Sequence, residues 1–142
     1  MQTIHATAVV IGNRCVLLRG TSGAGKSDLA LRLIDGGAML VADDRTELIR
    51  EQGDLIARCP SAIAGKLEVR GVGILTLPYV SPATVSMVVD LVAPEEVERL
   101  PETACVKLLG EQVCQVSLAP FEASAPAKVR LALERADRGR AG

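Results

Sequence analysis

The stretch that decides the fold is Gly20-Thr21-Ser22-Gly23-Ala24-Gly25-Lys26-Ser27, which matches the pattern G-x-x-x-x-G-K-[ST] at every fixed position. The apolar run Cys15–Leu18 precedes it, and residues 28–35 follow with the spacing of an amphipathic helix that ends at Gly36 and Gly37. Strand, glycine-rich loop and helix are the context that this pattern requires. The stretch therefore predicts a phosphate-binding loop of the Walker A type.

This loop has the chemistry to bind a nucleotide and a metal ion. Its glycines let the backbone turn tightly and direct N–H groups at phosphate oxygens, and the positive end of the helix dipole adds to the attraction. Lys26 is expected to reach the outer phosphates, and the Ser27 hydroxyl to bind Mg²⁺. The predicted nucleotide-binding residues are Gly20, Thr21, Ser22, Gly23, Ala24, Gly25, Lys26 and Ser27.

The composition limits the class of protein. A chain of 142 residues favours a single domain, and we expect residues 1–142 to form one. Hydrophobic residues make up 49% of the chain but aromatic residues only 1%, so Tyr79 and Phe121 are the only candidate stacking platforms. Together with a formal net charge of -1, this argues against nucleic acid as a partner.

The cysteines and the N-terminus indicate where the protein works. Cys15, Cys59, Cys105 and Cys114 form no C-x-x-C pair, and we expect buried free thiols in preference to metal ligands or disulfides. Residues 1–5 lack the basic and apolar segments of a signal peptide, and no apolar run reaches membrane-spanning length. We therefore expect a soluble, cytoplasmic protein with no membrane partner.

The remaining pattern predicts a β-rich α/β fold. A hairpin is expected around Gly12-Asn13-Arg14 and another around residues 51–54, because turn residues separate β-type runs at both places. Strands are expected over 3–11, 15–18, 38–42, 47–50, 55–58, 66–75, 84–92, 106–109 and 113–118, and further helices over 94–100 and 125–138.

Two carboxylates, Asp43 and Asp44, follow the buried strand 38–42. Ligands of open α/β sheets bind at the carboxyl ends of strands, and adjacent like charges favour a bound cation. We expect Asp43 to be a ligand of Mg²⁺ on nucleotide phosphates. The alternative is that both residues cap the turn that follows, since Asp is common in turns.

Three further residues are candidates. Glu68 and Arg70 stand two apart, on the same side if residues 66–75 are extended, and Gly71 and Gly73 would then allow close approach of another group. The alternative is a surface ion pair. His5, the single histidine, suits proton transfer but is also common as a structural residue.

The motifs together resemble a known family. In order and spacing, four motifs resemble those of the catalytic domain of HPr kinase/phosphorylase. They are His5, the glycine-rich loop with Asp28, Leu40-Val41-Ala42-Asp43-Asp44, and Leu67-Glu68-Val69-Arg70-Gly71-Val72-Gly73-Ile74. The likeness is strong over residues 3–100 and weaker beyond. Since the usual family member has a separate N-terminal domain, the chain looks like a short form.

The resemblance implies a fold and an activity. The fold would be α/β, a P-loop kinase core similar to that of phosphoenolpyruvate carboxykinase, with a mixed β-sheet and few flanking helices. The activity would be ATP- and Mg²⁺-dependent phosphorylation of a serine on the phosphocarrier HPr, with reversal by phosphorolysis. The family assembles as hexamers, so a homo-oligomer is expected.

The resemblance also implies residue roles. Lys26 would be the phosphate-binding catalytic lysine, and Asp44 the base that takes the serine proton. Ser27 and Glu68 would be magnesium ligands, and His5 a further active-site residue.

Two arginines complete the implied active site. Arg70 would act in both directions of the reaction. Arg99, in Glu98-Arg99-Leu100, is the best match to a late catalytic arginine.

The sequence departs from the family at two places. Thr21 replaces an acidic residue found in many relatives. The late segment Pro-x-x-Pro-Gly-Arg-Asn, associated with phosphorolysis and subunit contacts, corresponds to residues 119–128 without its Gly-Arg-Asn. Lys128 and Arg130 are candidates to replace the missing arginine, and the sequence leaves phosphorolysis and hexamer formation open.

Two other functions stay open. One is a small-molecule P-loop kinase or nucleotide hydrolase, including a relative of phosphoenolpyruvate carboxykinase. The other is a non-enzymatic nucleotide-binding regulatory module, although such a module has no use for a base at Asp44.

Overall fold

The structure is a computed structural model that describes residues 1–141, and side chains as far as residue 137. Two α-helices and two short 3-10 helices accompany the strands in these residues: α1 (Lys26–Asp35), α2 (Ala125–Ala141), η1 (Ser61–Ile63) and η2 (Pro94–Glu96). The strands are β1 (Gln2–Ile4), β2 (Ala6–Ile11), β3 (Arg14–Arg19), β4 (Met39–Ala42), β5 (Thr46–Glu51), β6 (Asp54–Arg58), β7 (Lys66–Val69), β8 (Gly73–Thr76), β9 (Ala83–Leu91), β10 (Ala104–Leu108) and β11 (Glu111–Leu118).

One mixed sheet organises the chain, in the order β1-β5-β6-β9-β3-β2-β4, with β11 and then β10 attached to β9. Strand β9 is its centre, because it pairs in parallel with β3 and β11 and antiparallel with β6. Strands β7 and β8 form a separate hairpin. The predicted fold class, a mixed sheet with few helices, is confirmed.

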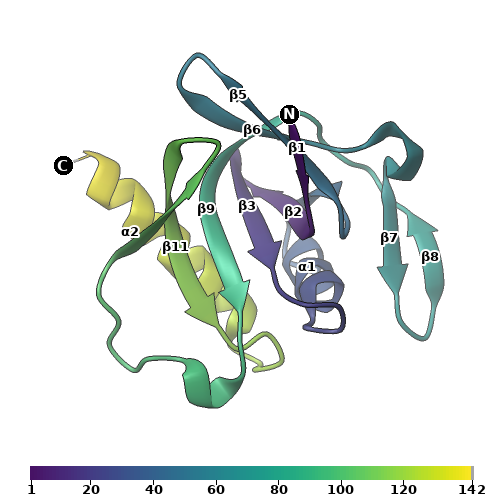
Figure 1. Ribbon diagram of the computed structural model, residues 1–142. Coiled ribbons are helices and arrows are strands. Elements are labelled where there is room, and N and C mark those ends of the chain that lie inside the picture. Colours follow the sequence, from purple (N-terminus) through teal and green to yellow (C-terminus); the bar gives the residue numbers. More distant parts are fainter. Residues whose placement is uncertain (142) are drawn as a thin grey trace.

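Alternating residues of the central strands supply two apolar layers. On one face, Val16 and Leu18 of β3 pack with Leu29 and Leu33 of α1 and with Leu133 of α2. On the other face, a second buried cluster joins residues of β2, β3, β4 and β9 to residues of β5, β6 and β11. Figure 1 shows both helices behind the central strands, with β5 and β6 curling over the opposite side.

Several strands end at one edge of the sheet. Strands β3, β9 and β11 are parallel, and β4 runs with them because both β3 and β4 pair antiparallel with β2. The arrows of β3, β9 and β11 point to the lower edge in Figure 1. The glycine-rich loop, Asp43-Asp44 and residues 119–124 follow β3, β4 and β11, so they meet at this edge.

Two predicted elements, the strand over 3–11 and the helix over 94–100, differ from the structure. The strand over 3–11 bends at His5, because β1 pairs with β5 whereas β2 pairs with β3 and β4. The predicted helix over 94–100 is only η2, and Val97 is already extended. A segment this short, followed by Pro101, cannot sustain an α-helix.

The prediction of one extended segment over 66–75 is wrong. Residues 70–72 form the turn of the β7–β8 hairpin. Gly71 and Gly73 have φ of 89° and 124°, which favour glycine. A Cβ built on either would meet nothing within 4 Å, so no other part of the described chain approaches these glycines closely. Within the chain they serve the turn.

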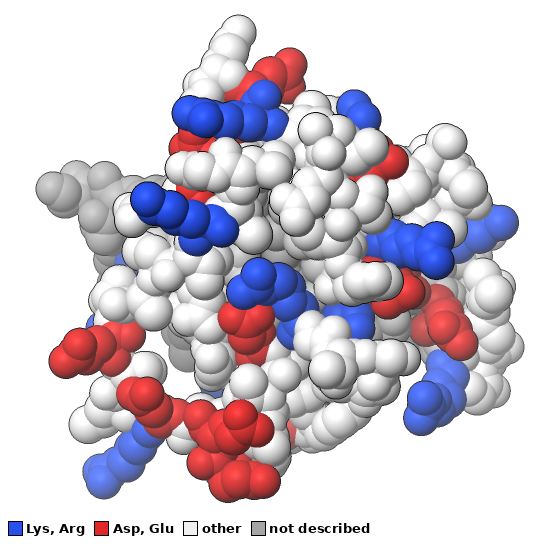
Figure 2. Space-filling model, viewed as in Figure 1, with Lys and Arg blue, Asp and Glu red and all other residues white. Residues whose placement is uncertain are grey.

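The surface carries charges of both signs. Figure 2 shows Lys and Arg interspersed with Asp and Glu, and acidic side chains gathered toward the end of the molecule where Figure 1 places η2. Among the described residues, no helix is both long and apolar enough to span a membrane. The expectation that nucleic acid is not a partner stays a prediction.

The prediction of buried free thiols is correct only in part. All four thiols are free, but only Cys15 is fully buried, Cys59 and Cys114 are half-buried, and Cys105 is exposed. Burial raises the pKa of the Cys15 thiol to about 12, since a thiolate would lose its hydration there. Cys15 is therefore a neutral core residue in the folded protein.

We predict that iodoacetamide at pH 8 modifies Cys105 while leaving Cys15 unmodified until the protein unfolds, because only the thiolate reacts. Mass spectrometry of tryptic peptides, with and without urea, measures both sites. Alkylation of Cys15 at the rate of Cys105 in the folded protein would contradict its burial.

Candidate active site

A cavity of about 410 Å³ lies at the carboxyl edge of the sheet. It is bounded by the glycine-rich loop, the first turns of α1, the second residue after β4, the end of β7 with the turn that follows it, and the segment after β11. Its lining residues are Ser22, Gly23, Gly25, Lys26, Ser27, Asp28, Leu31, Asp44, Glu68, Val69, Arg70 and Phe121.

The loop has the local geometry that its sequence requires. Gly20 packs so tightly that a Cβ there would lie 2.8 Å from Cβ of Ala24. Gly25 has φ of 101° and precedes Lys26, the first residue of α1. Among the described residues, no side chain caps the N-terminus of α1, which leaves its first N–H groups to bind an anion.

Lys26 is held inside this loop. Its side chain is 7% exposed, and its Nζ donates hydrogen bonds to the carbonyl oxygens of Gly20 at 2.8 Å and Thr21 at 3.1 Å. The ammonium group therefore lies inside the loop, bound to two of its carbonyl oxygens.

Asp43 connects three elements at the cavity. Its Oδ1 accepts hydrogen bonds from the hydroxyls of Ser27 at 2.6 Å and Thr7 at 3.0 Å. Its Oδ2 accepts one from the backbone N–H of Glu68 at 3.1 Å. Helix α1, strand β2 and hairpin β7–β8 are therefore held together by one carboxylate.

Asp44 is oriented differently from Asp43. Its φ of 67° is unusual for a residue with a side chain, and its backbone N–H donates to Oγ1 of Thr7 at 3.0 Å. The carboxylate is 61% exposed, lines the cavity and lies 3.9 Å from Nζ of Lys26. It is available to a group that approaches from solvent.

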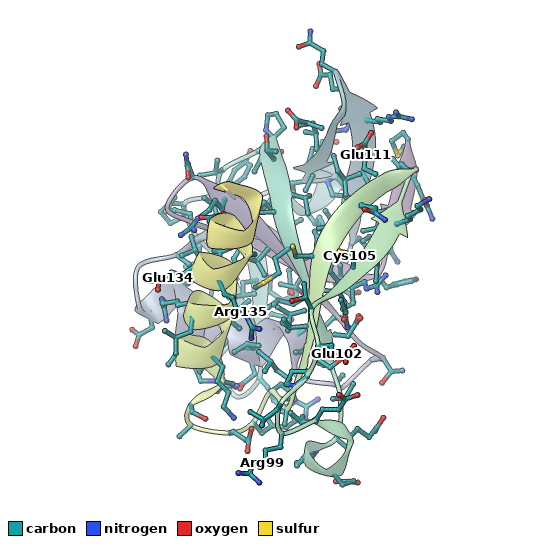
Figure 3. All side chains as sticks on the ribbon, turned by 90° about the vertical axis from the view of Figure 1, so that its left-hand side faces the viewer. Arg99, Glu102, Cys105, Glu111, Glu134 and Arg135 are labelled. Atoms are coloured by element: carbon teal, nitrogen blue, oxygen red, sulfur yellow. The ribbon has the colours of Figure 1, made fainter. Side chains whose placement is uncertain are left out.

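The structure brings most predicted site residues together. Glu68 and Arg70 line the same cavity from the hairpin, although Arg70 lies in the turn. His5 is exposed at the bend between β1 and β2, and Arg99 is exposed in the loop after η2, at the edge of the molecule in Figure 3. Neither His5 nor Arg99 lines the cavity.

The candidates for the missing late arginine also lie outside the cavity. Arg130 donates to the carbonyl oxygen of Leu33 at 3.0 Å, near the end of α1. Lys128 pairs with Glu122 at 3.0 Å. Arg130 thus connects α2 to α1, and Lys128 connects α2 to the segment that precedes it.

Sequence reasoning missed several positioning residues. Thr7 is fully buried in an otherwise apolar strand, and a single polar residue in such a run is the signal that could have found it. Arg19, directly before the loop, forms a bidentate pair with Asp90 of β9 at 2.8 and 3.1 Å. Gln115 of β11 also donates to Asp90, at 2.9 Å.

The oxygen atoms near Asp43 are suitable ligands for Mg²⁺, which prefers oxygen ligands and few protein carboxylates. The Ser27 hydroxyl and Asp43 carboxylate are 2.6 Å apart, and Glu68 lines the adjoining wall. Within the described residues, no group of three or more His, Cys, Asp or Glu side chains is placed to hold a metal ion.

The fold is of the α/β class, and its cavity is bounded by a loop with the G-x-x-x-x-G-K-[ST] pattern. The family model for the HPr serine kinase C-terminal domain matches residues 1–119. The chain belongs to this family.

Curated relatives and a solved structure agree with this assignment. The HPr kinase/phosphorylases of Burkholderia lata and Burkholderia cenocepacia are each 38% identical to the chain over 127 residues, 82% of this chain and 39% of theirs. The chain thus spans about two fifths of their length. The structure of the Hpr(Ser) kinase/phosphatase from Coxiella burnetii matches with a TM-score of 0.88 and 30% identity, covering 100% of both chains.

We predict that Thr7→Val lowers the free energy of unfolding by about 1–3 kcal/mol, because it leaves the Asp44 N–H without its acceptor and removes a donor to Asp43. It should also weaken MgATP binding about tenfold, since Asp43 and Asp44 lose their alignment. Urea unfolding and calorimetric titration measure the two effects.

Thr46→Val is the matched control, since Thr46 is also buried but donates only to the carbonyl oxygen of Ala6. It should lower stability and leave MgATP affinity unchanged. Equal affinities of Thr7→Val and Thr46→Val would exclude a positioning role for Thr7.

Proposed function

We propose that this chain is an ATP- and Mg²⁺-dependent kinase domain that phosphorylates a serine of HPr or a related phosphocarrier. The observation that carries the proposal is one cavity lined by the glycine-rich loop, Lys26, Ser27 and the exposed carboxylate of Asp44. Asp43 lies behind Ser27 and accepts its hydrogen bond. We also propose that residues 1–142 act as one catalytic domain in the cytoplasm.

The loop and Lys26 would bind the phosphate chain. Phosphoryl transfer depends mainly on stabilising charge and aligning the acceptor. The N–H groups at the start of α1 and the ammonium of Lys26 provide fixed positive charge around the transferred group. Arg70, in the hairpin turn, adds a cation at the same cavity.

Ser27, Asp43 and Glu68 would hold Mg²⁺. When bound there, the ion would neutralise charge on the phosphate oxygens. Thr7 and the Glu68 N–H keep Asp43 pointed at Ser27, so these oxygens are already oriented.

Asp44 would accept the proton of the serine hydroxyl. Its exposed carboxylate can meet an incoming side chain, and its proximity to Lys26 places it beside the bound phosphates. His5 and Arg99 lie outside the cavity, and their catalytic roles stay predictions.

A protein substrate is favoured over a small molecule by the hairpin beside the cavity. Val72 and Ile74 are 68% and 71% exposed there, next to Arg70, and such apolar side chains suit contact with a protein. Figure 1 shows the hairpin standing away from the main sheet beside α1. Phosphorolysis of the product and assembly into a homo-oligomer are further predictions from the family.

We predict that Asp44→Asn lowers phosphoryl transfer to HPr about 10²–10⁴-fold while MgATP affinity changes little, because the base is lost but the phosphate loop is intact. Incubation with labelled ATP, Mg²⁺ and HPr from the same organism measures transfer, and calorimetry measures affinity. Asp54→Asn is the matched control, since Asp54 is exposed in the β5–β6 hairpin.

An HPr variant lacking its acceptor serine should remain unlabelled. Tight MgATP binding without label on wild-type HPr would contradict the proposed substrate. Label on a small molecule, or on nothing, would then favour the small-molecule kinase or the regulatory module.

A further inference from the structure

The single phenylalanine of the sequence, Phe121, lies at the cavity. It belongs to the segment between β11 and α2 and is 68% exposed, although large apolar side chains are usually buried. Its ring touches the glycine-rich loop through its tip, because a Cβ on Gly25 would lie 2.9 Å from Cζ and 3.1 Å from Cε1. This edge contact leaves most of the ring open.

The segment that carries Phe121 is anchored on both sides. Arg32 of α1 donates to the carbonyl oxygens of Pro120 and Glu122, the two neighbours of Phe121. Arg32 is itself paired with Asp28 at 2.9 Å. The backbone on both sides of an exposed aromatic ring is thereby held in place, which lowers the entropy lost when a ligand packs on the ring.

The order of the strands places Phe121 opposite the transfer end of the cavity. Strands β4, β2, β3, β9 and β11 are successive neighbours, so the glycine-rich loop after β3 lies between Asp44 after β4 and Phe121 after β11. Two strand spacings, about 10 Å, separate the end of β3 from the ends of β4 and β11. A phosphate chain bound in the loop with its outer phosphate at Asp44 therefore extends its other end toward Phe121.

We propose that Phe121 is the platform on which the base of the nucleotide packs. This inference rests on the proposed nucleotide-dependent function and adds the residue that distinguishes a nucleotide from a bare polyphosphate. Aromatic rings stack on nucleobases with a gain that does not depend on hydrogen bonds. The apolar walls beside Phe121 continue into a second hollow, lined in part by Leu91, Val92 and Pro94.

The test compares MgATP with inorganic tripolyphosphate and Mg²⁺, since the second ligand has phosphates but no base. Phe121→Ala should weaken MgATP binding at least about fivefold and leave tripolyphosphate binding unchanged. Phe121→Tyr, which keeps the ring, should restore MgATP affinity. In the transfer assay, Phe121→Ala should raise KM for ATP with little change in kcat.

Leu131→Ala is the control, because Leu131 is 62% exposed on α2 and does not line the cavity. Equal weakening of both ligands by Phe121→Ala would overturn the proposal, as it would indicate a damaged loop. Unchanged MgATP affinity would overturn it as well. Failure of the wild-type chain to bind either ligand would instead overturn the proposed function.

A fluorescent variant gives an independent readout. The sequence contains no tryptophan, so Phe121→Trp introduces the only indole of the protein. Stacking of the base on the indole should quench its fluorescence on addition of MgATP, whereas tripolyphosphate should not. Quenching of equal size by both ligands, or by neither when both bind, would contradict a base at this position.

Discussion

The candidate site depends on the hydrogen bonds that the carboxylate of Asp43 accepts. It accepts hydrogen bonds from the hydroxyls of Ser27 and Thr7 and from the N–H of Glu68. Helix α1, strand β2 and the β7–β8 hairpin approach the cavity from different parts of the sequence, and this one side chain fixes their relative positions. Because the Thr7 hydroxyl also accepts a hydrogen bond from the Asp44 N–H, the same set of hydrogen bonds orients the proposed base.

Structural elements that depend on residues close together in the chain could be predicted from the sequence. The glycine-rich loop, helix α1 and the hairpins around residues 12–14 and 51–54 follow from local patterns, and the structure contains all of them. The turn at Gly71 and Gly73 is not predicted, because apolar residues lie on both sides of the two glycines, which then resemble interruptions of one strand. Local periodicity does not reveal where a strand reverses.

The contacts between distant residues could not be predicted in this way. Thr7 and Asp43 are 36 positions apart, and Arg19 and Asp90 are 71 apart, so no spacing rule connects them. The position of Phe121 is a similar case, because a low aromatic content describes how many rings exist and not where the fold places them. Strand order, which brings the segments after β3, β4 and β11 to one edge, supplies this information.

The most direct measurement is a crystal structure of the chain with Mg²⁺ and a non-hydrolysable ATP analogue. We expect the phosphate chain in the loop, Nζ of Lys26 moved from the carbonyl oxygens of Gly20 and Thr21 to the outer phosphates, and the metal ion at Ser27 and Asp43. A phosphate chain bound outside the loop, or a metal ion held without Ser27 and Asp43, would contradict the assignment of this cavity as the phosphoryl-transfer site.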